Sequence, residues 1–322
     1  MNERSFFGTD GIRGRANEPP LTVDFALLVG KAAATLAWEG RGESKEGRKP
    51  RILLGRDTRL SGQALVSAIA AGATSSGADV FELGVLPTPA VALLANSMRA
   101  DLAIVVTASH NPFEDNGIKF FNNEGRKLSD ELEARIEVFL RGEEKPCRVS
   151  AAKMGRMYDL SSASDRYVEI ILRTFPREKS LEDLRVVLDC ANGAASRTSP
   201  QILEELGANL TVLNARPDGT NINRKCGSNF PEVLAHEVCR LQADVGIAHD
   251  GDADRVVLVD EKGTVLDGDE ILAIAALNMI ERGKLPGNSI VATVMSNFGL
   301  DELLERYGGK VWRTNVGDRF VA

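Results

Sequence analysis

Three stretches of the chain share one order of apolar and polar positions. Each begins with a short β-branched apolar run, passes through a polar turn into an amphipathic helix, and reaches a second apolar run. These stretches are 51–83, 185–213 and 289–314, and glycine ends the helix in each of them. A strand, a helix and a strand at this spacing form a βαβ unit. The pattern therefore predicts three tandem, related α/β domains with mixed, largely parallel sheets.

The first two units also match beyond the second strand. RADLAIVVTASHNP (99–112) aligns without a gap with QADVGIAHDGDADR (242–255), and each segment is an apolar strand that runs into a polar loop. The alignment places TASHNP and DGDADR at the C-terminal ends of equivalent strands, where ligands of open α/β sheets bind. We therefore expect the two loops to face one cleft between the first two domains.

The segments between the units contain further predicted elements. Thr22 has the side chain of a helix cap, and the pattern after it predicts a helix over 24–38. Helices are also predicted over 129–140 and 163–174, and the segment 258–268 leads to the third unit.

These elements suggest domain boundaries near 150 and 260, which gives predicted domains of 1–150, 151–260 and 261–322. The third unit reaches only VGDRFVA before the sequence stops, without the second strand and loop of the other two. A sheet without its later strands has an unpaired edge. We therefore expect the third domain to be incomplete and the parent chain to be longer.

The composition narrows the class of protein. The 322 residues are 43% hydrophobic and 26% charged, which is typical of a globular protein of two or three domains. The net charge of −7 argues against a nucleic-acid partner, because a phosphate backbone requires an excess of Lys and Arg. An apolar segment long enough for a membrane span or an export signal is missing from the sequence. The four cysteines are scattered, as is typical of reduced thiols in a cytoplasmic protein.

The loop DGDADR carries Asp250, Asp252 and Asp254 at alternate positions. In an extended loop their carboxylates point the same way, and they repel one another unless a cation lies between them. The loop begins like a calcium-binding EF-hand, but Arg255 occupies the position where that loop needs glycine. A site for a hard cation remains as a hypothesis, beside the simpler alternative of an acidic surface turn.

The loop TASHNP contains the adjacent pair Ser109 and His110 after a predicted buried strand over 103–106. Such a pair is common by chance, and the G-x-S-x-G elbow of many serine hydrolases is missing around it. Lys119, in NGIKFF, is predicted at the start of a strand from which it can reach the same cleft. The alternative is that it is an ordinary solvated lysine.

The N-terminal FGTDGIRGR combines three glycines with Asp10, Arg13 and Arg15. This composition suits a loop that approaches an anion, although its spacing is neither a dinucleotide fingerprint nor a P-loop. A mobile leader with basic residues is the alternative interpretation.

Taken in this order, FGTDGIRG, TASHNP and DGDADR resemble the α-D-phosphohexomutase family over the whole chain. The resemblance implies that Ser109 is the phosphoserine. It also implies that Asp250, Asp252 and Asp254 bind one Mg²⁺ together with an oxygen of the Ser109 phosphate. By the same resemblance, Lys119 and Arg13 lie near the reacting oxygens and His110 lies beside the phosphoserine. Arg255 either contacts the phosphoryl group of the substrate or braces the acidic loop.

The resemblance implies an isomerase that moves a phosphoryl group between Ser109 and a sugar phosphate through a bisphosphorylated intermediate. DNGIKFF and VGDRF favour glucosamine 6-phosphate and glucosamine 1-phosphate as the pair that is interconverted, with mannose or glucose phosphates as the alternative. A homodimer formed through the first domain is a further implication of the family.

The sugar-recognition loop and the phosphate-binding fourth domain of that family are missing from this sequence, so we expect strongly reduced turnover. A truncated fragment that binds sugar phosphates without turnover and a metal-dependent phosphatase remain as alternatives.

Overall fold

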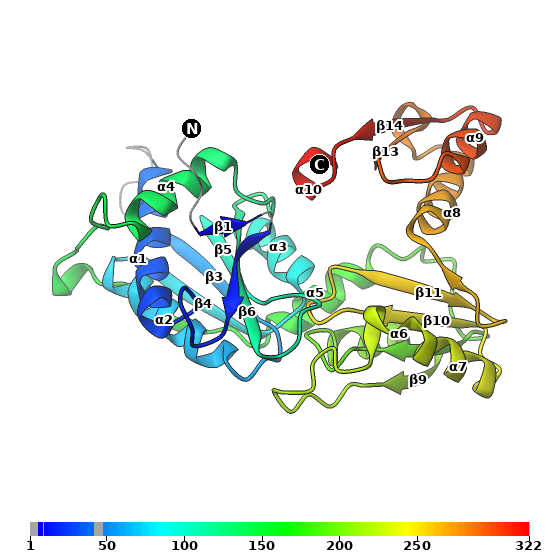
Figure 1. The fold of residues 1–322 in the computed structure, drawn as a ribbon, viewed down its shortest axis with the longest axis horizontal. Coiled ribbons are helices and arrows are strands. Elements are labelled where there is room, and N and C mark those ends of the chain that lie inside the picture. The colour runs from blue at the N-terminus through cyan, green and yellow to red at the C-terminus, as the bar shows by residue number, and fades with distance from the viewer. Residues whose placement is uncertain (1–5, 9, 42–47, 322) are drawn as a thin grey trace.

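The structure is a computed structural model that describes residues 6–8, 10–41 and 48–321. Figure 1 shows three successive units: a first sheet with its helices, a second sheet beside it, and a smaller third unit above the second. Within the described residues the sheets have seven, five and two strands. The predicted fold of three tandem, related α/β units is confirmed.

The first sheet has the strand order β1-β2-β6-β5-β3-β4-β7. Its strands are β1 (Phe7–Gly8), β2 (Gly11–Arg15), β3 (Arg51–Arg56), β4 (Asp79–Val85), β5 (Leu102–Val106), β6 (Asp115–Asn122) and β7 (Met157–Asp159). Strands β5, β3, β4 and β7 are parallel to one another, whereas β6, β2 and β1 are joined by antiparallel pairing. Within FGTDGIRGR, Phe7–Gly8 and Gly11–Arg15 thus form an antiparallel pair of strands at the edge of the sheet, so the mobile-leader alternative is wrong for the described residues.

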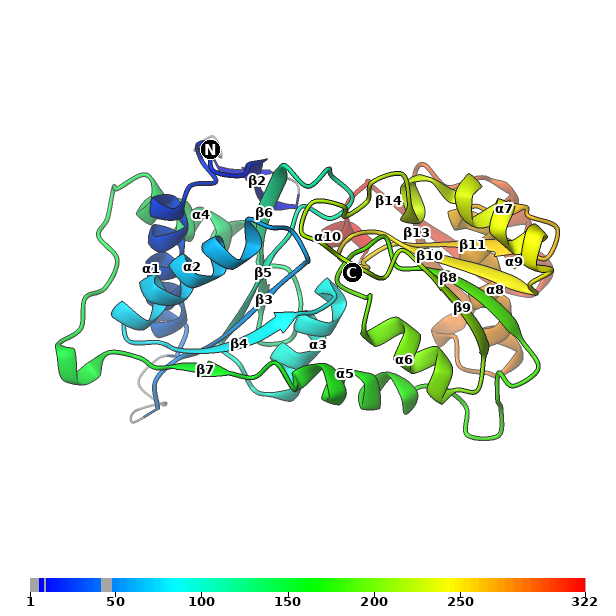
Figure 2. The same ribbon diagram turned by 90° about the horizontal axis from the view of Figure 1, so that it is seen from below.

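Helices cover both faces of the first sheet. One apolar core lies beneath α1 (Val23–Glu39), α2 (Gly62–Ser75) and α4 (Asp130–Leu140). The other lies beneath α3 (Thr88–Ser97) and α5 (Ala163–Leu172). Figure 2 shows the first group stacked on one side of the sheet and α3 and α5 on the other.

The backbones of α1 and α2 come into contact at two glycines, one in each helix. A Cβ atom on Gly30 would lie 2.0 Å from the carbonyl oxygen of Ile69, and one on Gly72 would lie 2.0 Å from that of Leu27. Thr22 caps α1 by accepting a hydrogen bond from the Phe25 amide, as predicted.

The second sheet repeats the strand order of the first. Its order is β12-β11-β10-β8-β9, formed by β8 (Arg185–Asp189), β9 (Asn209–Leu213), β10 (Val245–His249), β11 (Val256–Asp260) and β12 (Val265–Leu266). The run β11-β10-β8-β9 corresponds to β6-β5-β3-β4, with α6 (Thr198–Glu205) and α7 (Pro231–Leu241) as its helices. Strands β5 and β10 are therefore equivalent. The segment 258–268 is not only a connection, because most of it forms the β11-β12 hairpin.

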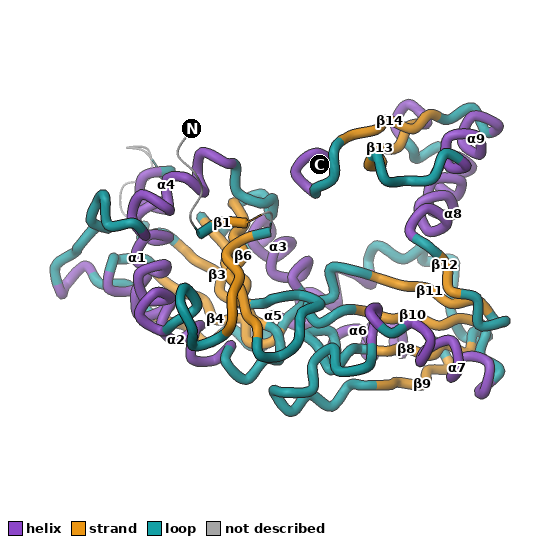
Figure 3. The backbone as a smooth tube through the Cα atoms, viewed as in Figure 1, coloured by secondary structure: helices purple, strands orange, loops and turns teal. Residues whose placement is uncertain are grey.

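The third unit begins with α8 (Gly268–Glu281), which Figure 3 shows rising from the second sheet. It continues with β13 (Ser289–Thr293), α9 (Gly299–Arg306) and β14 (Lys310–Thr314), and the two strands are parallel. The short helix α10 (Asp318–Val321) follows, and Figure 1 shows it turned towards the first unit. Single 3₁₀ turns occur at Ala151–Lys153, Gly227–Asn229 and Pro286–Asn288. No helix in the described part of the chain combines the length and apolar character that a membrane span requires.

The cysteines differ strongly in burial, and this gives a test of the second unit. Burial and the charge of Asp189 raise the pKa of both Cys190 and Cys226 to about 12, whereas Cys239 is exposed. At pH 8 we expect iodoacetamide to modify Cys239 readily and the two buried thiols at least about 1,000-fold more slowly, because the thiolate is the reactive form. Peptide mass spectrometry measures the three rates, with the urea-unfolded chain as the control. Rapid labelling of Cys190 in the folded chain would contradict this packing.

Candidate active site

The loops that follow β5 and β10 meet between the first and second units. The Ser109 hydroxyl donates a hydrogen bond of 2.5 Å to Oδ2 of Asp250 and lies 3.5 Å from Oδ1 of Asp254. This contact joins residues 141 positions apart in sequence. The equivalent ends of β5 and β10 bring the two loops together, which agrees with the expectation from the repeated pattern.

Ser109 is held in an unusual backbone conformation. Its φ is +52°, in the left-handed region that non-glycine residues seldom adopt, and only 1% of its surface is exposed. The Ser109 backbone amide donates to the Thr107 hydroxyl at 3.0 Å. The Ser109 hydroxyl lies 3.4 Å from Nδ1 of His110. The opposing loop comes so close that a Cβ atom on Gly251 would lie 2.6 Å from the Ser109 carbonyl oxygen. Glycine in DGDADR therefore permits the approach of the two loops.

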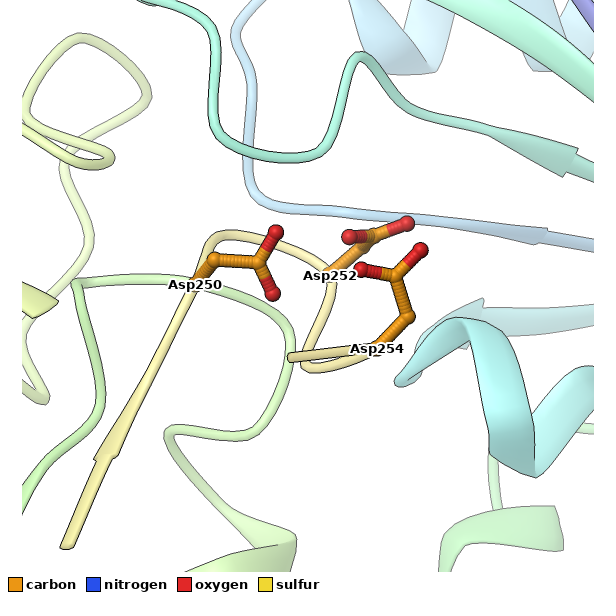
Figure 4. Close-up of side chains that lie close together, drawn as sticks. All are labelled: Asp250, Asp252 and Asp254. Carbon is orange, nitrogen blue, oxygen red and sulfur yellow. The ribbon is translucent and has the colours of Figure 1, made fainter. Parts of the chain in front are cut away.

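The three aspartates of DGDADR converge. Figure 4 shows their carboxylates grouped above the loop that follows β10, and one oxygen of each lies within 4.8 Å of the others. Asp250 and Asp252 are completely buried, whereas Asp254 is exposed. The loop is a turn with Ala253 at a φ of +53°, so it is not the extended loop that the sequence led us to expect. The turn brings the carboxylates together by curvature instead of by alternation.

The crowded carboxylates perturb one another. Burial, together with the charges of Asp252 and Asp254, raises the pKa of Asp250 from 3.8 to about 7. Burial also acts to raise the pKa of Asp252, but Lys119 and the Thr88 hydroxyl outweigh it and lower that pKa. The Thr88 hydroxyl donates to Asp252 at 2.6 Å from the first turn of α3.

Lys119 connects three carboxylates from two segments of the chain. Its ammonium group lies 2.9 Å from Asp252, 2.9 Å from Asp254 and 3.0 Å from Asp10, and the residue is 2% exposed. Burial acts to lower the pKa of Lys119, but the three carboxylates outweigh it and raise the pKa above its ordinary value. Lys119 lies in the middle of β6 and not at its start, because β6 begins at Asp115. The alternative of a solvated lysine is wrong.

A cavity of about 700 Å³ adjoins these loops and receives side chains from all three units. Its lining includes Asp10, Arg13 and His110 from the first unit, Asp254 and Arg255 from the second, and Val316 and Gly317 from the third. Arg13 forms an ion pair of 2.7 Å with Asp10. Burial and the nearby charges of Arg255 and Arg13 lower the pKa of His110. The structure thus gathers the residues that the family resemblance selected around one loop pair and its cavity. Arg15 lies apart from them, because its exposed side chain pairs with Glu18 at 3.4 Å.

The acidic cluster fits a hard divalent cation. Its donors are carboxylate oxygens, which Mg²⁺ prefers. Asp252 Oδ1 is buried and has no hydrogen-bond partner among the described residues, and such an orphaned acceptor is costly unless a ligand binds it. The raised pKa of Asp250 points the same way, because burial and the charges of Asp252 and Asp254 act on it while the Lys119 ammonium group contacts the other two carboxylates. An acidic surface turn would be solvated, so that alternative does not describe these residues.

Sequence reasoning missed several residues of the site. Asp57 and Arg59, in the loop after β3, form a buried ion pair of 2.9 Å directly beneath the Ser109 loop. A signal for them exists, because β3 is parallel to β5 and its C-terminal end lies at the same edge of the sheet. Thr88 and Asn223 offer no such signal, since their contacts depend on how the two units are placed.

Comparisons with known proteins agree with this geometry. The chain matches the phosphoglucomutase/phosphomannomutase alpha/beta/alpha domains I, II and III over residues 4–146, 165–263 and 267–322. It is 49% identical over 319 residues to a phosphoglucosamine mutase of Nitratidesulfovibrio vulgaris and 50% identical over 321 residues to that of Rhodospirillum rubrum. These alignments cover 99% and 100% of this chain and 70% of each relative.

A solved structure of a phosphoglucomutase/phosphomannomutase family protein from Burkholderia thailandensis shares the fold. Its TM-score is 0.82 at 28% identity, and the match covers 97% of this chain and 66% of that one. The sequence match and the shared fold extend over both loops of the site. The chain therefore belongs to the phosphoglucomutase/phosphomannomutase family.

Proposed function

We propose that this chain carries out phosphoryl transfer between Ser109 and a hexosamine phosphate, as a phosphoglucosamine mutase that interconverts glucosamine 6-phosphate and glucosamine 1-phosphate. The observation that carries the proposal is the 2.5 Å contact between the Ser109 hydroxyl and Asp250 within a carboxylate cluster. The 49–50% identity to phosphoglucosamine mutases over nearly the whole chain supports the choice of substrate.

Asp250, Asp252 and Asp254 would hold one Mg²⁺, with an oxygen of phosphorylated Ser109 as a further ligand. When bound, the ion supplies positive charge that offsets the negative charge of the phosphoryl group during transfer. The donor set supports this assignment, because two of the three carboxylates are buried and one buried oxygen lacks a partner within the described chain.

The residues of the chain account for the movement of charge and protons. In the forward step a sugar hydroxyl attacks the phosphorus atom on Ser109, a P–O bond to the sugar forms, and the P–Oγ bond breaks. The proton lost by the sugar hydroxyl is balanced by the proton that Ser109 Oγ regains. His110 has a lowered pKa and lies 3.4 Å from that oxygen, so its neutral ring is placed to exchange a proton with it.

Lys119 and Arg13 are proposed to act through charge. The raised pKa of Lys119 keeps its ammonium group protonated, so it stabilises negative oxygens and does not serve as a base at neutral pH. Arg13 and Arg255 line the cavity, where a guanidinium group can bind the substrate's second phosphate or the transferring group. After the first transfer the bisphosphorylated sugar turns over and returns its other phosphate to Ser109, with the same bond changes in reverse.

Single-turnover phosphorylation tests this proposal. We expect the unphosphorylated chain to gain one phosphate on Ser109 when it is incubated with glucose 1,6-bisphosphate and Mg²⁺, as measured by intact-protein and peptide mass spectrometry. The phosphorylated chain should then lose that phosphate faster to glucosamine 1-phosphate than to mannose 1-phosphate or glucose 1-phosphate.

Two outcomes would contradict the proposal. Steady release of inorganic phosphate with no sugar bisphosphate formed would indicate a phosphatase, and failure to phosphorylate Ser109 would leave only a sugar-phosphate-binding fragment. Faster transfer to mannose 1-phosphate would overturn the assignment of substrate alone. The domain limits 1–150, 151–260 and 261–322, the homodimer and the cytoplasmic location stay predictions.

A further inference from the structure

The backbone of the Ser109 loop is bound from two sides by side chains that contact no reacting group. Arg59 Nη2 donates to the carbonyl oxygens of Ser109 at 2.9 Å and of Asn111 at 2.8 Å. Asn223 Nδ2, from the second unit, donates to the same two oxygens at 2.8 and 3.0 Å. The two carbonyl oxygens of the loop thus share one pair of donors, one from each unit.

Arg59 is built into the first unit as a fixed support. It is 1% exposed, and its Nε donates to the buried carboxylate of Asp57 at 2.9 Å. Asp57 also accepts a hydrogen bond from Thr107, whose hydroxyl in turn accepts one from the Ser109 amide. The remaining guanidinium nitrogen, Nη1, donates to the carbonyl oxygens of Pro112 and Asp115. Because a guanidinium group is planar and rigid, these bonds fix the curvature of the loop from Ser109 to Asp115.

Asn223 supplies the opposing support from the second unit. Its φ of +58° is in the left-handed region, which asparagine tolerates better than most residues. Its backbone N–H donates to the Ala191 carbonyl oxygen at 2.9 Å. The residue is 6% exposed. A Cβ atom on Gly251 would lie 2.8 Å from its Nδ2, so Asn223 fills the space between the Ser109 loop and the acidic loop.

These contacts bear directly on the nucleophile. The left-handed backbone of Ser109 is strained for a side-chain-bearing residue and persists only where the surroundings hold it. The two donors bind its carbonyl oxygen, which fixes the peptide plane and hence the direction of the hydroxyl towards Asp250. A misplacement of about 1 Å can slow a reaction about 100-fold.

We propose that Arg59 and Asn223 are positioning residues that hold Ser109 at the distance and angle needed for phosphoryl transfer, with Asn223 coupling that geometry to the second unit. The inference rests on the proposed function, because Ser109 must be the phosphorylated residue. It adds to that function a second-unit residue that controls the nucleophile without touching the phosphate.

Asn223→Asp tests the proposal with little change in shape. The aspartate keeps the tolerance for a left-handed backbone but replaces the donor by an oxygen, which repels the two carbonyl oxygens. Asn221→Asp is the matched control, because Asn221 lies in the same loop and its side-chain amide donates to the Arg216 carbonyl oxygen, not to the Ser109 loop. The measurement is the time course of Ser109 phosphorylation by glucose 1,6-bisphosphate at several concentrations, in Mg²⁺.

We expect Asn223→Asp to lower the limiting rate constant by about 10- to 100-fold, with a half-saturating bisphosphate concentration within about two-fold of the unaltered chain. The fraction of chains that is finally phosphorylated should not change. A purely structural role would instead reduce that final fraction, since partly unfolded chains take no phosphate. Asn221→Asp should keep the original rate constant, and an Asn223→Asp rate equal to that of Asn221→Asp would overturn the inference.

Arg59→Lys gives a second measurement. Lysine keeps the positive charge opposite Asp57 but cannot donate to all four carbonyl oxygens that Arg59 binds. The limiting rate constant of phosphorylation should therefore fall again, and the half-saturating concentration of bisphosphate should stay the same. If this variant is too unstable to purify, Asn223→Asp alone decides. Failure of the unaltered chain to phosphorylate Ser109 would refute the proposed function, whereas normal phosphorylation of both variants would refute only the positioning roles.

Discussion

Ser109→Ala should abolish phosphorylation of the chain by glucose 1,6-bisphosphate, lowering the rate by at least about 10,000-fold. The hydroxyl is the atom that forms the new P–O bond in the proposed reaction, and alanine offers no replacement. His110 Nδ1 lies 3.4 Å from the Ser109 hydroxyl oxygen and belongs to a ring that is placed for proton exchange.

The same substitution should leave cation binding largely intact, which separates loss of the nucleophile from loss of the fold. Asp250, Asp252 and Asp254 all remain, so the Mg²⁺ affinity of the unphosphorylated chain should stay within about ten-fold of its original value. Isothermal titration with Mg²⁺ and intact-protein mass spectrometry measure the two properties. Ser75→Ala is the matched control, because Ser75 ends α2 and its hydroxyl donates to the Gly72 carbonyl oxygen of the same helix. Uptake of phosphate by the Ser109→Ala chain would refute the assignment of the nucleophile.

The repeated pattern predicted the architecture because it constrains strand order. Once two units share a strand-helix-strand run and a following strand-loop segment, the loops after β5 and β10 must lie at equivalent sheet edges. The hydrogen bond between Ser109 and Asp250 agrees with this expectation. The sequence therefore predicted both the fold class and the meeting of the two loops.

Local conformation was less accessible from the sequence. Alternation along DGDADR predicted convergence in an extended loop, but the chain turns at Ala253 instead. An alanine in the left-handed region has no sequence signature, since its conformation is imposed by the packing of the loop against the first unit. The predicted convergence of the three carboxylates was right, whereas the predicted backbone conformation of the loop was wrong.

Two other contacts between the first and second units carry no signal in the sequence. Thr88 donates to Asp252 across 164 positions, and Asn223 reaches the Ser109 carbonyl across 114. Neither residue belongs to a sequence motif from which its hydrogen-bond partner could be predicted. By contrast, Arg59 follows a buried strand parallel to β5, so the edge-of-sheet argument that selected Ser109 would also have selected its loop.

Asp250→Asn should abolish high-affinity Mg²⁺ binding yet stabilise the metal-free protein above pH 7. Burial and two neighbouring carboxylates raise the pKa of Asp250 from 3.8 to about 7. The folded state thus binds this proton more tightly than the unfolded state, so ionisation costs stability. The cost is absent below pH 3.8, grows between pH 3.8 and 7, and is fully present above pH 7. It amounts to up to about 4 kcal/mol.

Asparagine removes this cost because it cannot ionise. Its side-chain oxygen can still accept a hydrogen bond from the Ser109 hydroxyl. The 3.3 Å hydrogen bond from the backbone N–H of Arg255 to Oδ1 of Asp250 is lost, at a cost of about 1 kcal/mol. The free energy of unfolding of the metal-free variant at pH 8 should therefore rise by about 1–3 kcal/mol. Near pH 4 the gain should vanish, since the original carboxyl group is then largely protonated in the fold.

Mg²⁺ should reverse the order of stability. The unaltered chain gains stability from a ligand that binds only its folded state, whereas the variant should bind Mg²⁺ at least about 100-fold more weakly and gain little. Urea unfolding at pH 4 and pH 8, with and without Mg²⁺, measures all four values. Asp183→Asn is the matched control, because it makes the same charge change at an exposed position. A variant less stable than the unaltered metal-free chain at pH 8 would show that hydrogen bonds, and not carboxylate repulsion, dominate this cluster, and that the unfavourable charge we attribute to the site does not exist.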